Sequence, residues 1–482
     1  MNVSELVKAI GCQLPENVED FNCGGIYIDS RKVTENSVFI CISGARVDGH
    51  DYYKSAVEKG AKLIVCERDL GIDNQIVVDN PLIAYTKMCA RFFGEPAKQL
   101  KLIGVTGTSG KSTTTYMIKS VLEQAGKKVG LIGTTGNIIG NELLPSHNTT
   151  PEAFELHSLF ELMLKSGCEY VVMEVSSQAL DQQRVYGLHF ETAVFTNFSQ
   201  AHLDYHKTME EYFAAKLTLF DMCSRAVVNA DDKMSRQVID KCKENGLPVY
   251  TYSVNGNAAN VSASDVSFYP DSVSYTLGCD NDSASITVKI PGLFMVYNST
   301  AAATVGISLG LEFADVAKYL PNVKGPKGVL EVVPCDRDFT LIIDFAHTPE
   351  QLRSVTKMLS QFKKGRLVTL FGCGGDRDRT KRPKMAAAVT ENSDFTIITS
   401  DNPRTEDPNA IIDDILTGVV CEKDAYTVIP DRRKAIHYAV HNAKKDDIVL
   451  FAGKGYETYQ ILNSGTVHFD EREVIAQALN EQ

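Results

Sequence analysis

The stretch Gly104-Val105-Thr106-Gly107-Thr108-Ser109-Gly110-Lys111-Ser112 follows a short apolar run and precedes a segment with helical periodicity. Between a strand and a helix, small residues let backbone N–H groups turn inward onto phosphate oxygens. Val105 stands where the commonest phosphate-loop pattern has glycine, so the match is to a variant of that pattern. A Lys-Ser pair directly after the last glycine favours a phosphate loop over a turn without a ligand. We predict that ATP binds here through Gly107, Thr108, Gly110, Lys111 and Ser112.

Length and composition narrow the class of protein. At 482 residues the chain is too long for one ordinary core, which predicts about three domains. A net charge of -12 and a pI near 5.4 provide no basic surface, so we expect no nucleic-acid partner. Twelve cysteines without a C-x-x-C pair, and no signal-peptide pattern at the start, predict a cytoplasmic protein with reduced thiols. No apolar run approaches the roughly 20 residues that span a bilayer, so we expect no membrane insertion.

Short apolar runs alternate with helical patterns along the chain, which is typical of α/β proteins. A glycine- and lysine-bearing stretch at 322–328 looks like a linker. We therefore predict an α/β fold of three domains: a small N-terminal domain at 1–100, a central domain at 101–327 with a P-loop-type, mostly parallel sheet, and a Rossmann-like C-terminal domain at 328–482. The expected strands lie at 37–42, 61–66, 128–132, 169–175, 192–196, 339–344, 366–371, 395–399 and 447–452.

Two side chains outside the loop are candidate metal ligands. Glu174 ends an apolar strand pattern, and an acid at the carboxyl edge of a sheet reaches a Mg²⁺ ion beside the phosphates. Without the phosphate loop, an ordinary strand-end glutamate would be the better interpretation. His202 follows the next expected strand, so its imidazole is placed to join the same ion, although a lone histidine is more often structural.

Several further motifs occur in order along nearly the whole chain, and together with the phosphate loop they resemble the Mur ligase family, in particular its meso-diaminopimelate-adding branch. They are Met-Glu-Val-Ser-Ser at 173–177, Phe-Thr-Asn at 195–197, His-Leu-Asp-Tyr-His at 202–206, Tyr-Phe-Ala-Ala-Lys at 212–216, Asp-Phe-Ala-His-Thr-Pro at 344–349, Phe-Gly-Cys-Gly-Gly-Asp-Arg-Asp at 371–378, Asp-Asn-Pro-Arg at 401–404 and Gly-Lys-Gly at 453–455.

The resemblance implies an ATP-dependent amide-bond ligase of peptidoglycan precursor synthesis, here a monomer. ATP would phosphorylate a carboxylate of UDP-N-acetylmuramoyl-L-alanyl-D-glutamate, and the amine of meso-diaminopimelate would attack the acyl phosphate. By the same resemblance, residues 1–100 would bind the UDP-sugar, 101–327 would bind ATP and 328–482 would bind the amino acid.

The resemblance also assigns the site residues. Ser112, Glu174 and His202 would hold Mg²⁺, and Lys216 would be carbamylated so that it helps to hold a second ion, whereas a plain lysine would repel the metal. Asn298 would contact adenine and Asp344 the ribose, so that ATP would bridge two domains. The UDP-sugar-peptide would lie against Ser30, Asn148, Thr149, Thr150, Ser177, Gln182 and Arg184, and the amino acid against Arg377, Asp401, Asn402, Arg404, Gly453 and Glu457.

Arg404 is the residue that we expect to select the incoming amino acid. A guanidinium binds a carboxylate through two parallel hydrogen bonds, so it would accept the distal carboxylate of meso-diaminopimelate and disfavour the bare ammonium end of lysine. The alternative is an ordinary surface ion pair, which the surrounding four-residue motif makes a weaker interpretation.

The chain departs from the family pattern at Ser109, Gln178, Ala201, Met295, Val329 and Tyr456. Valine at 329 replaces a family arginine expected near the phosphates, and the loss of such a contact costs a factor of about a thousand or more in phosphoryl transfer. A second hypothesis is therefore a catalytically impaired paralogue that binds nucleotide or muramoyl-peptide and acts through partners. A third, a related ligase with another acyl substrate, has little support from the intact motif at Arg404.

Overall fold

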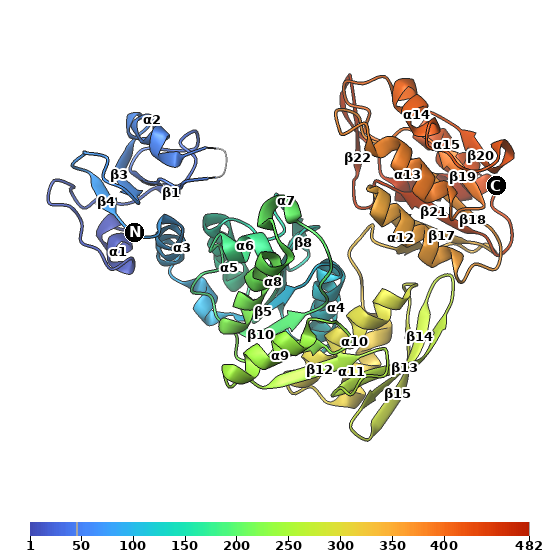
Figure 1. Cartoon of the computed structure of the whole chain (residues 1–482), viewed down its shortest axis with the longest axis horizontal. Coiled ribbons are helices and arrows are strands. Elements are labelled where there is room, and N and C mark those ends of the chain that lie inside the picture. Colours follow the sequence, from blue (N-terminus) through green and yellow to red (C-terminus); the bar gives the residue numbers. More distant parts are fainter. Residues whose placement is uncertain (45–46, 482) are drawn as a thin grey trace. The chain divides into compact units, whose positions relative to one another are not determined.

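The computed structural model describes residues 1–44 and 47–481. It confirms the predicted α/β class, with helices and strands alternating along the chain (Figure 1). The described residues divide into two compact units: residues 1–252, 257–260 and 304–311 form the first unit, and residues 253–256, 261–303 and 312–482 form the second.

The first unit begins with a small parallel sheet in the order β1-β2-β3-β4. Along β3, Leu63 and Val65 pack into one hydrophobic core, whereas Ile64 and Cys66 pack into another. A strand buried on both faces explains the unbroken apolar run in the sequence. The elements are α1 (Val3–Ala9), β1 (Gly25–Tyr27), β2 (Ser37–Ile40), α2 (Tyr53–Glu58), β3 (Ala61–Cys66), β4 (Gln75–Val77) and α3 (Pro81–Phe92).

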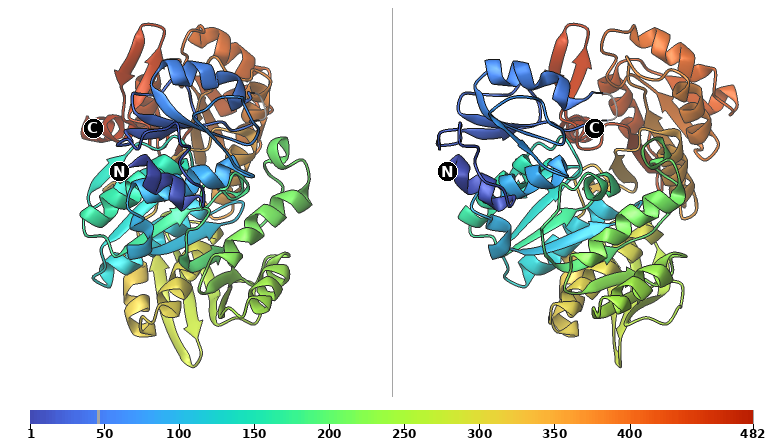
Figure 2. Two further views of the ribbon diagram at one scale, coloured as in Figure 1. Left: turned by 90° about the vertical axis from the view of Figure 1, so that its left-hand side faces the viewer. Right: turned by 60° about the vertical axis from the view of Figure 1, so that its left-hand side comes forward.

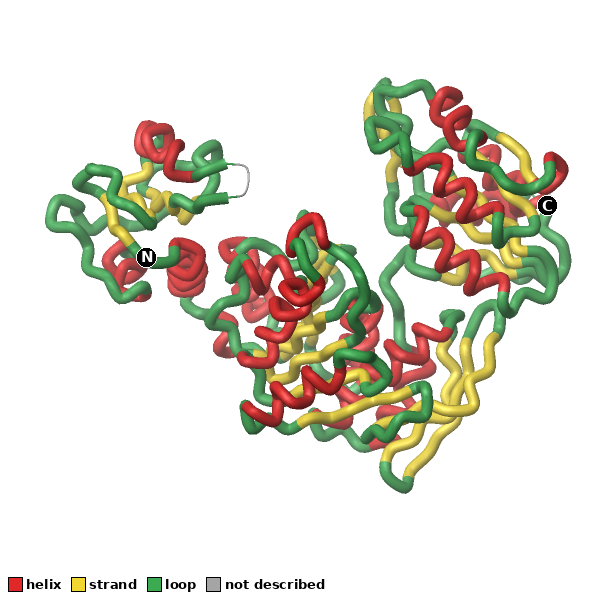
Figure 3. The backbone as a smooth tube through the Cα atoms, viewed as in Figure 1, coloured by secondary structure: helices red, strands yellow, loops and turns green. Residues whose placement is uncertain are grey.

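The larger sheet of the first unit runs in the order β12-β11-β10-β5-β9-β6-β7-β8. Its strands are parallel from β12 to β6, whereas β7 and β8 add antiparallel pairs, and helices flank the strands (Figures 2 and 3). These strands are β5 (Lys101–Thr106), β6 (Val129–Gly133), β7 (Gly136–Ile139), β8 (Glu142–Leu144), β9 (Tyr170–Glu174), β10 (Phe190–Phe195), β11 (Ala226–Asn229) and β12 (Val249–Ser253). The helices are α4 (Lys111–Gln124), α5 (Ala153–Lys165), α6 (Ser177–Asp181), α7 (Leu203–His206), α8 (Met209–Leu217) and α9 (Ser235–Glu244).

The register of the central strands decides where the predicted site residues lie. Val105 of β5 pairs with Glu174 of β9, and Thr106 pairs with Phe195 of β10. Because parallel strands end at the same edge of a sheet, the phosphate loop, Glu174 and the segment after β10 meet there.

The second unit contains an antiparallel meander, a six-stranded sheet and a two-stranded sheet in which β22 (Tyr459–Leu462) pairs with β23 (Gly465–His468). The meander consists of β13 (Val261–Phe268), β14 (Val273–Cys279) and β15 (Asp282–Val288), followed by α10 (Leu293–Ser308) and α11 (Phe313–Tyr319). The sequence analysis did not predict this meander. Along β14, buried Val273, Tyr275 and Leu277 alternate with less buried residues, and turn residues at 269–272 and 280–282 separate the strands, so the sequence carries a signal for the meander.

The C-terminal sheet has the order β16-β17-β21-β18-β19-β20 and is parallel except for β16. Strands β17, β21, β18 and β19 end at Asp344, Ala452, Phe371 and Ile398, so the loops that follow them share one edge. The elements are β16 (Glu331–Val333), β17 (Thr340–Asp344), α12 (Pro349–Ser360), β18 (Leu367–Phe371), α13 (Lys381–Thr390), β19 (Phe395–Ile398), α14 (Pro408–Leu416), β20 (Tyr426–Val428), α15 (Arg432–His441), β21 (Ile448–Ala452), β22 (Tyr459–Leu462), β23 (Gly465–His468) and α16 (Glu471–Asn480).

Among the described residues, no helix combines the length and apolar character needed to cross a membrane.

A fully buried ion pair joins α15 to α16. The guanidinium of Arg432 donates to Glu471 Oε1 at 2.9 Å from Nε and to Ala452 O at 2.8 Å from Nη2, and both side chains are 0% exposed. The pair therefore ties the C-terminal helix to the end of β21. A buried charge that loses its partner is strongly destabilising, because burial has already removed its hydration.

We expect Arg432→Met to lower the free energy of unfolding by about 3–5 kcal/mol, because Glu471 would remain buried without its partner. Chemical denaturation followed by circular dichroism measures the change. The matched control is Arg236→Met, since the Arg236 side chain is 90% exposed and its pairing with Asp240 contributes at most about 1 kcal/mol. Equal unfolding midpoints for the two variants would show that the buried pair does not hold α16.

Candidate active site

The phosphate loop is held open by the end of β10. Gly107 has φ +148°, and a Cβ atom there would lie 2.0 Å from Thr196 Oγ1, so no other residue fits. Asn197 accepts hydrogen bonds from Thr108 N and Ser109 N, each at 2.9 Å. Helix α4 then begins without a side-chain cap, so its first N–H groups remain for an anion.

Two lysines from different helices donate to one carbonyl of this loop. Lys111 Nζ lies 3.1 Å from Gly107 O and 3.0 Å from Thr108 O, and Lys216 Nζ lies 2.8 Å from Gly107 O. Burial, assisted by the charge of Lys111, holds the pKa of Lys216 well below its ordinary value. Burial also lowers the pKa of Lys111, although the nearby carboxylate of Glu174 opposes this shift. Burial therefore shifts the protonation equilibrium of Lys216 toward the neutral amine.

Glu174 occupies the place predicted for it, buried at the last position of β9. Thr134 donates to its carboxylate twice, from N to Oε1 at 2.8 Å and from Oγ1 to Oε2 at 3.1 Å. A Cβ atom on Gly133 would lie 2.4 Å from Oε1, so the close approach requires glycine. Burial raises the pKa of Glu174, while the charge of Lys111 and hydrogen bonds from Thr134 and Ser112 oppose the rise. The sequence analysis did not identify Thr134, although its position directly after β6 is a signal for a sheet-edge residue.

His202 lies next to the loop through an aromatic contact. Its ring centroid is 5.8 Å from that of Tyr212, whose hydroxyl lies 3.2 Å from Thr108 Oγ1. The backbone of His202 has φ +54°, an uncommon conformation for a residue other than glycine.

The donors at this edge fit Mg²⁺, which prefers oxygen ligands. The Ser112 hydroxyl and the Glu174 carboxylate belong to that class, and the amino groups of Lys111 and Lys216 do not. As an unmodified amine, Lys216 is unsuitable as a ligand for Mg²⁺, but its burial and lowered pKa suit reaction with carbon dioxide, which would convert it into a carboxylate-like group.

Four of the residues predicted for the UDP-sugar-peptide lie together behind β9. Arg184 donates from Nη1 to Thr150 O at 2.8 Å and from Nε to Gln182 Oε1 at 3.1 Å. Ser177 Oγ lies 2.8 Å from His206 Nε2. Thr149 is linked to this group through Thr134, whose Oγ1 donates to Thr149 Oγ1 at 3.0 Å.

The remaining two residues predicted to contact the UDP-sugar-peptide, Ser30 and Asn148, have less structural support for that role. Ser30 lies on the N-terminal sheet domain, where its carbonyl accepts from Lys59 Nζ at 3.1 Å. Asn148 is exposed.

A cavity of about 450 Å³ elsewhere in the first unit is lined by none of the predicted site residues.

In the second unit, Asp344 ends β17 and is buried. Its carboxylate oxygens accept from Leu330 N and Ala346 N, each at 2.8 Å, and burial raises the pKa of the carboxyl to about 6. Asn298, the other residue predicted to contact the nucleoside, is buried in α10.

A cavity of about 510 Å³ opens at the shared edge of the C-terminal sheet. Loops that follow four strands, β17, β18, β19 and β21, line it. All the residues predicted to bind the amino acid are among its walls: Arg377, Asp401, Asn402, Arg404, Gly453 and Glu457.

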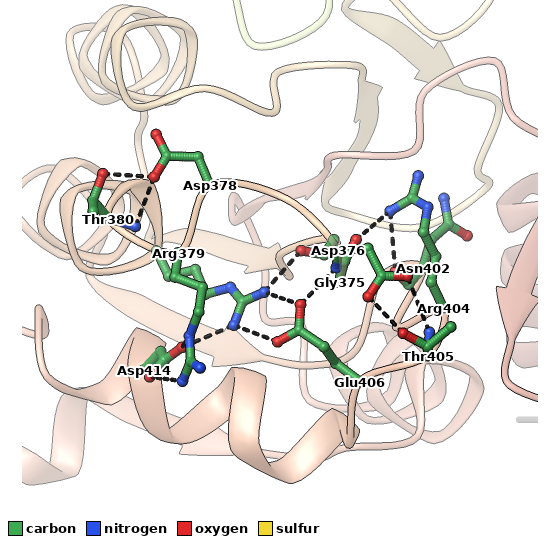
Figure 4. A network of polar contacts seen from close by, with 12 residues as sticks. Gly375, Asp376, Asp378, Arg379, Thr380, Asn402, Arg404, Thr405, Glu406 and Asp414 are labelled. Carbon is green, nitrogen blue, oxygen red and sulfur yellow. Dashed lines mark hydrogen bonds and ion pairs between the residues drawn. The ribbon is translucent and has the colours of Figure 1, made fainter.

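A network of polar contacts places Arg404 (Figure 4). Its Nη1 donates to Gly375 O at 2.8 Å, and its backbone has φ +52°. The fully buried Arg382 holds the two loops together, because it donates to Glu406 Oε1 at 2.8 Å and to Gly374 O at 3.3 Å. Sequence reasoning missed Arg382, since nothing in the run of charges at 376–382 distinguishes the buried arginine from the exposed ones.

Lys454 is a second functional residue that sequence reasoning missed, although it lies inside a quoted motif. Its buried Nζ donates to Glu457 Oε2 at 2.8 Å and to Asn402 Oδ1 at 3.2 Å. Asn402 Nδ2 donates to the same Glu457 oxygen at 2.9 Å. The charge of Glu457 is thus already compensated, whereas Asp401 keeps its carboxylate at the cavity wall beside Gly453.

Comparisons with known proteins agree with this arrangement. Three domain families match the chain: the Mur ligase family, catalytic domain, over residues 22–91, the Mur ligase middle domain over 105–306, and the Mur ligase, glutamate ligase domain over 330–455.

The full-length relatives share one enzyme name with each other and with a solved structure. A UDP-N-acetylmuramoyl-L-alanyl-D-glutamate–2,6-diaminopimelate ligase of Clostridium botulinum is 42% identical, with 100% of both chains covered. That of Geobacillus thermodenitrificans is 43% identical over 94% of each chain. A solved structure of a ligase with this name has a TM-score of 0.77 at 31% identity and covers 100% of this chain and 99% of its own. The resemblance seen in the motifs is confirmed, and this chain belongs to the Mur ligase family.

Proposed function

We propose that this chain is an ATP-dependent ligase that joins meso-diaminopimelate to UDP-N-acetylmuramoyl-L-alanyl-D-glutamate in peptidoglycan precursor synthesis. The observation that carries the proposal is the cavity at the C-terminal sheet edge, which gathers all the residues expected to bind the amino acid. Support also comes from the full-length relatives, whose names specify 2,6-diaminopimelate.

The first step is phosphoryl transfer to a carboxylate oxygen of the muramoyl dipeptide. The free N–H groups at the start of α4 and the ammonium of Lys111 hold the phosphates, and they stabilise the charge that moves from ATP to the acyl phosphate. Bound Mg²⁺ would neutralise further phosphate charge, held by Ser112, Glu174, His202 and a carbamylated Lys216. ADP leaves as the bond to the γ-phosphorus breaks.

In the second step, the amine of meso-diaminopimelate attacks the acyl carbon. The new C–N bond forms as the C–O bond to phosphate breaks, and the amine loses a proton to give the amide. Asp401 is the carboxylate placed to receive the ammonium of the arriving amino acid, since Lys454 and Asn402 already occupy Glu457.

The remaining assignments stay proposals. Residues 1–100, 101–327 and 328–482 would serve the UDP-sugar, ATP and the amino acid. Asn298 and Asp344 would bind the nucleoside, and the muramoyl-peptide would lie against Ser30, Asn148, Thr149, Thr150, Ser177, Gln182 and Arg184.

Arg404 is proposed to select the amino acid. Its Nη1 is engaged by the Gly375 carbonyl, which leaves Nε and Nη2 as a pair of donors on one edge of the guanidinium. Such an edge binds a carboxylate with two parallel hydrogen bonds and repels an ammonium. The distal carboxylate of meso-diaminopimelate fits this edge, and the side chain of lysine does not.

One observation keeps the impaired paralogue as a second candidate. Val329 lies between Gly328 and Leu330 in the turn whose backbone binds Asp344, so an apolar side chain occupies a position beside the predicted ribose contact. An arginine there would add positive charge near the nucleotide, and valine does not.

Phosphate release from ATP tests the function. With Mg²⁺, bicarbonate and the muramoyl dipeptide, we expect release with meso-diaminopimelate and little with lysine or without an amino acid. Lys111→Ala should reduce this release by at least about a thousandfold, because the phosphates lose their mobile cation. Lys127→Ala, at an exposed lysine paired with Glu169, is the control. ATP binding without release for any acceptor would favour the paralogue.

Carbamylation of Lys216 is tested with ¹³C-labelled bicarbonate. We expect a carbamate resonance in the NMR spectrum of the wild-type chain, because burial lowers the pKa of the Lys216 amine and so favours its nucleophilic, unprotonated form. Lys216→Met should remove the resonance. Lys119→Met should keep it, since the amine of Lys119 is engaged by the carboxylate of Glu123 at 2.5 Å. A resonance that persists in Lys216→Met would place the carbamate elsewhere.

The role of Arg404 predicts a change in acceptor preference. Arg404→Gln should lower kcat/KM for meso-diaminopimelate by about a hundredfold, mainly through KM, because two charge-assisted hydrogen bonds are lost. Lysine should be affected much less. Arg379→Gln is the matched control, since Arg379 belongs to the neighbouring loop after β18 but pairs with Asp414 outside the cavity. Equal losses for both acceptors would contradict selection by Arg404.

A further inference from the structure

Two histidines and a glutamate gather at the ends of α15 and α16, outside the cavity and the phosphate loop. His437 and His441 are four residues apart on α15, so they project from the same face of the helix. Glu481 directly follows α16. One ligand atom from each of the three side chains lies within 4.8 Å of the other two.

The hydrogen bonds of this cluster set one imidazole in a metal-binding form. His441 Nε2 lies 3.0 Å from the carbonyl of Ala478, and because a carbonyl only accepts, Nε2 carries the proton. In the neutral ring, Nδ1 then presents its lone pair. Histidines that bind metals are commonly oriented in this way, with the second nitrogen donating to a carbonyl or carboxylate.

The carboxylate stands next to the other imidazole. His437 Nδ1 and Glu481 Oε2 are 2.9 Å apart, and the two side chains are 22% and 57% exposed. Ligand atoms around a tetrahedral ion with bonds of about 2.0–2.1 Å are a little over 3 Å apart, so this pair already has nearly the required spacing. Side chains at this surface have the freedom to complete the approach.

We propose that His437, His441 and Glu481 form a binding site for a divalent transition-metal ion of the Zn²⁺ class. Two imidazoles and one carboxylate are a borderline donor set that suits Zn²⁺ and leaves one position for water. Mg²⁺ prefers oxygen ligands in octahedral geometry, so the ion used in phosphoryl transfer does not compete for this site.

The place of the site in the fold gives it a structural consequence. Helix α16 is already fastened at its first turn, where Glu471 pairs with Arg432 and Arg472 donates to Glu331 at 2.9 Å and to Gly455 O at 3.2 Å. An ion bound by Glu481 and the α15 histidines fastens its other end. The metal thereby stabilises the helix whose first turn supports the loop after β21.

The alternative for this cluster is an ordinary histidine–glutamate ion pair. The chain offers such a pair for comparison, because His468 Nε2 lies 2.8 Å from Glu473 Oε2 at an exposed position. Among the described residues, no third histidine, cysteine or acidic ligand joins His468 and Glu473, whereas the α15–α16 cluster has three ligands close together. His468 is therefore a matched control.

Calorimetric titration of the full, untagged chain with ZnCl₂ in the presence of Mg²⁺, after removal of metals with a chelator, tests the site. We expect one saturable site that His441→Ala and Glu481→Gln each weaken at least about tenfold, and that His468→Ala leaves unchanged. Zn²⁺ bound by the partly exposed cysteines, Cys12, Cys279, Cys335 and Cys421, would persist in His441→Ala. Circular dichroism of the metal-free variants checks that they are folded.

Thermal unfolding provides a second measurement, independent of ligase activity. Zn²⁺ should raise the Tm of the wild-type and His468→Ala chains, since an ion that binds the folded state stabilises it, and should do so much less for His441→Ala. Absence of saturable binding, or binding and Tm shifts that are the same in His441→Ala, would overturn the proposal.

Discussion

Parallel pairing of β5 with β9 and β10 is the constraint on which the first half of the site depends. The register sets Val105 opposite Glu174 and Thr106 opposite Phe195, so three chain segments far apart in the sequence leave the sheet at one edge. Glycines at 107 and 133 then permit approaches that a Cβ atom would block. The buried carboxylate of Glu174 and the loop carbonyl of Gly107 are consequently close enough for their charges and dipoles to influence the lysines beside them.

Electrostatics at this edge explain the chemistry proposed for it. Two lysines donate to the carbonyl of Gly107, and burial disfavours the charge on both. Lys111 has a carboxylate nearby, whereas for Lys216 the nearest charge is that of Lys111, and its pKa falls further. A neutral amine at this buried position is reactive toward carbon dioxide. Pairing of the resulting carbamate anion with cations would offset the free-energy cost of burying its charge. Burial of Lys216 thus accounts both for its lowered pKa and for the carbamylation proposed for it.

The second half of the site is organised by buried cations. Arg382 joins the loop after β18 to the loop after β19, Lys454 joins the loop after β21 to Asn402, and Arg432 joins α15 to α16. Each of these side chains is buried with acceptors around it, as a charge in a low-dielectric region requires. Arg404 itself is only half-buried, and its left-handed backbone is maintained by this surrounding network. Arg382 also contributes to the lining of the cavity, which the half-buried Arg404 faces.

The sequence alone determined the α/β class, the phosphate loop and most of the strands, because buried parallel strands are continuous apolar runs between turn residues. It also pointed to Lys111, Glu174 and Arg404 as candidate site residues, because their motifs lie at or after the ends of expected strands. Only the tertiary structure decided which arginine is buried, since Arg377, Arg379 and Arg382 look alike in a charged run and differ in what packs around them. The meander of β13–β15 was missed although Val273, Tyr275 and Leu277 alternate with less buried residues along β14, so in this case the sequence does carry the signal. The low pKa of Lys216 and the grouping of His437, His441 and Glu481 arise from long-range packing, which no local pattern in the sequence records.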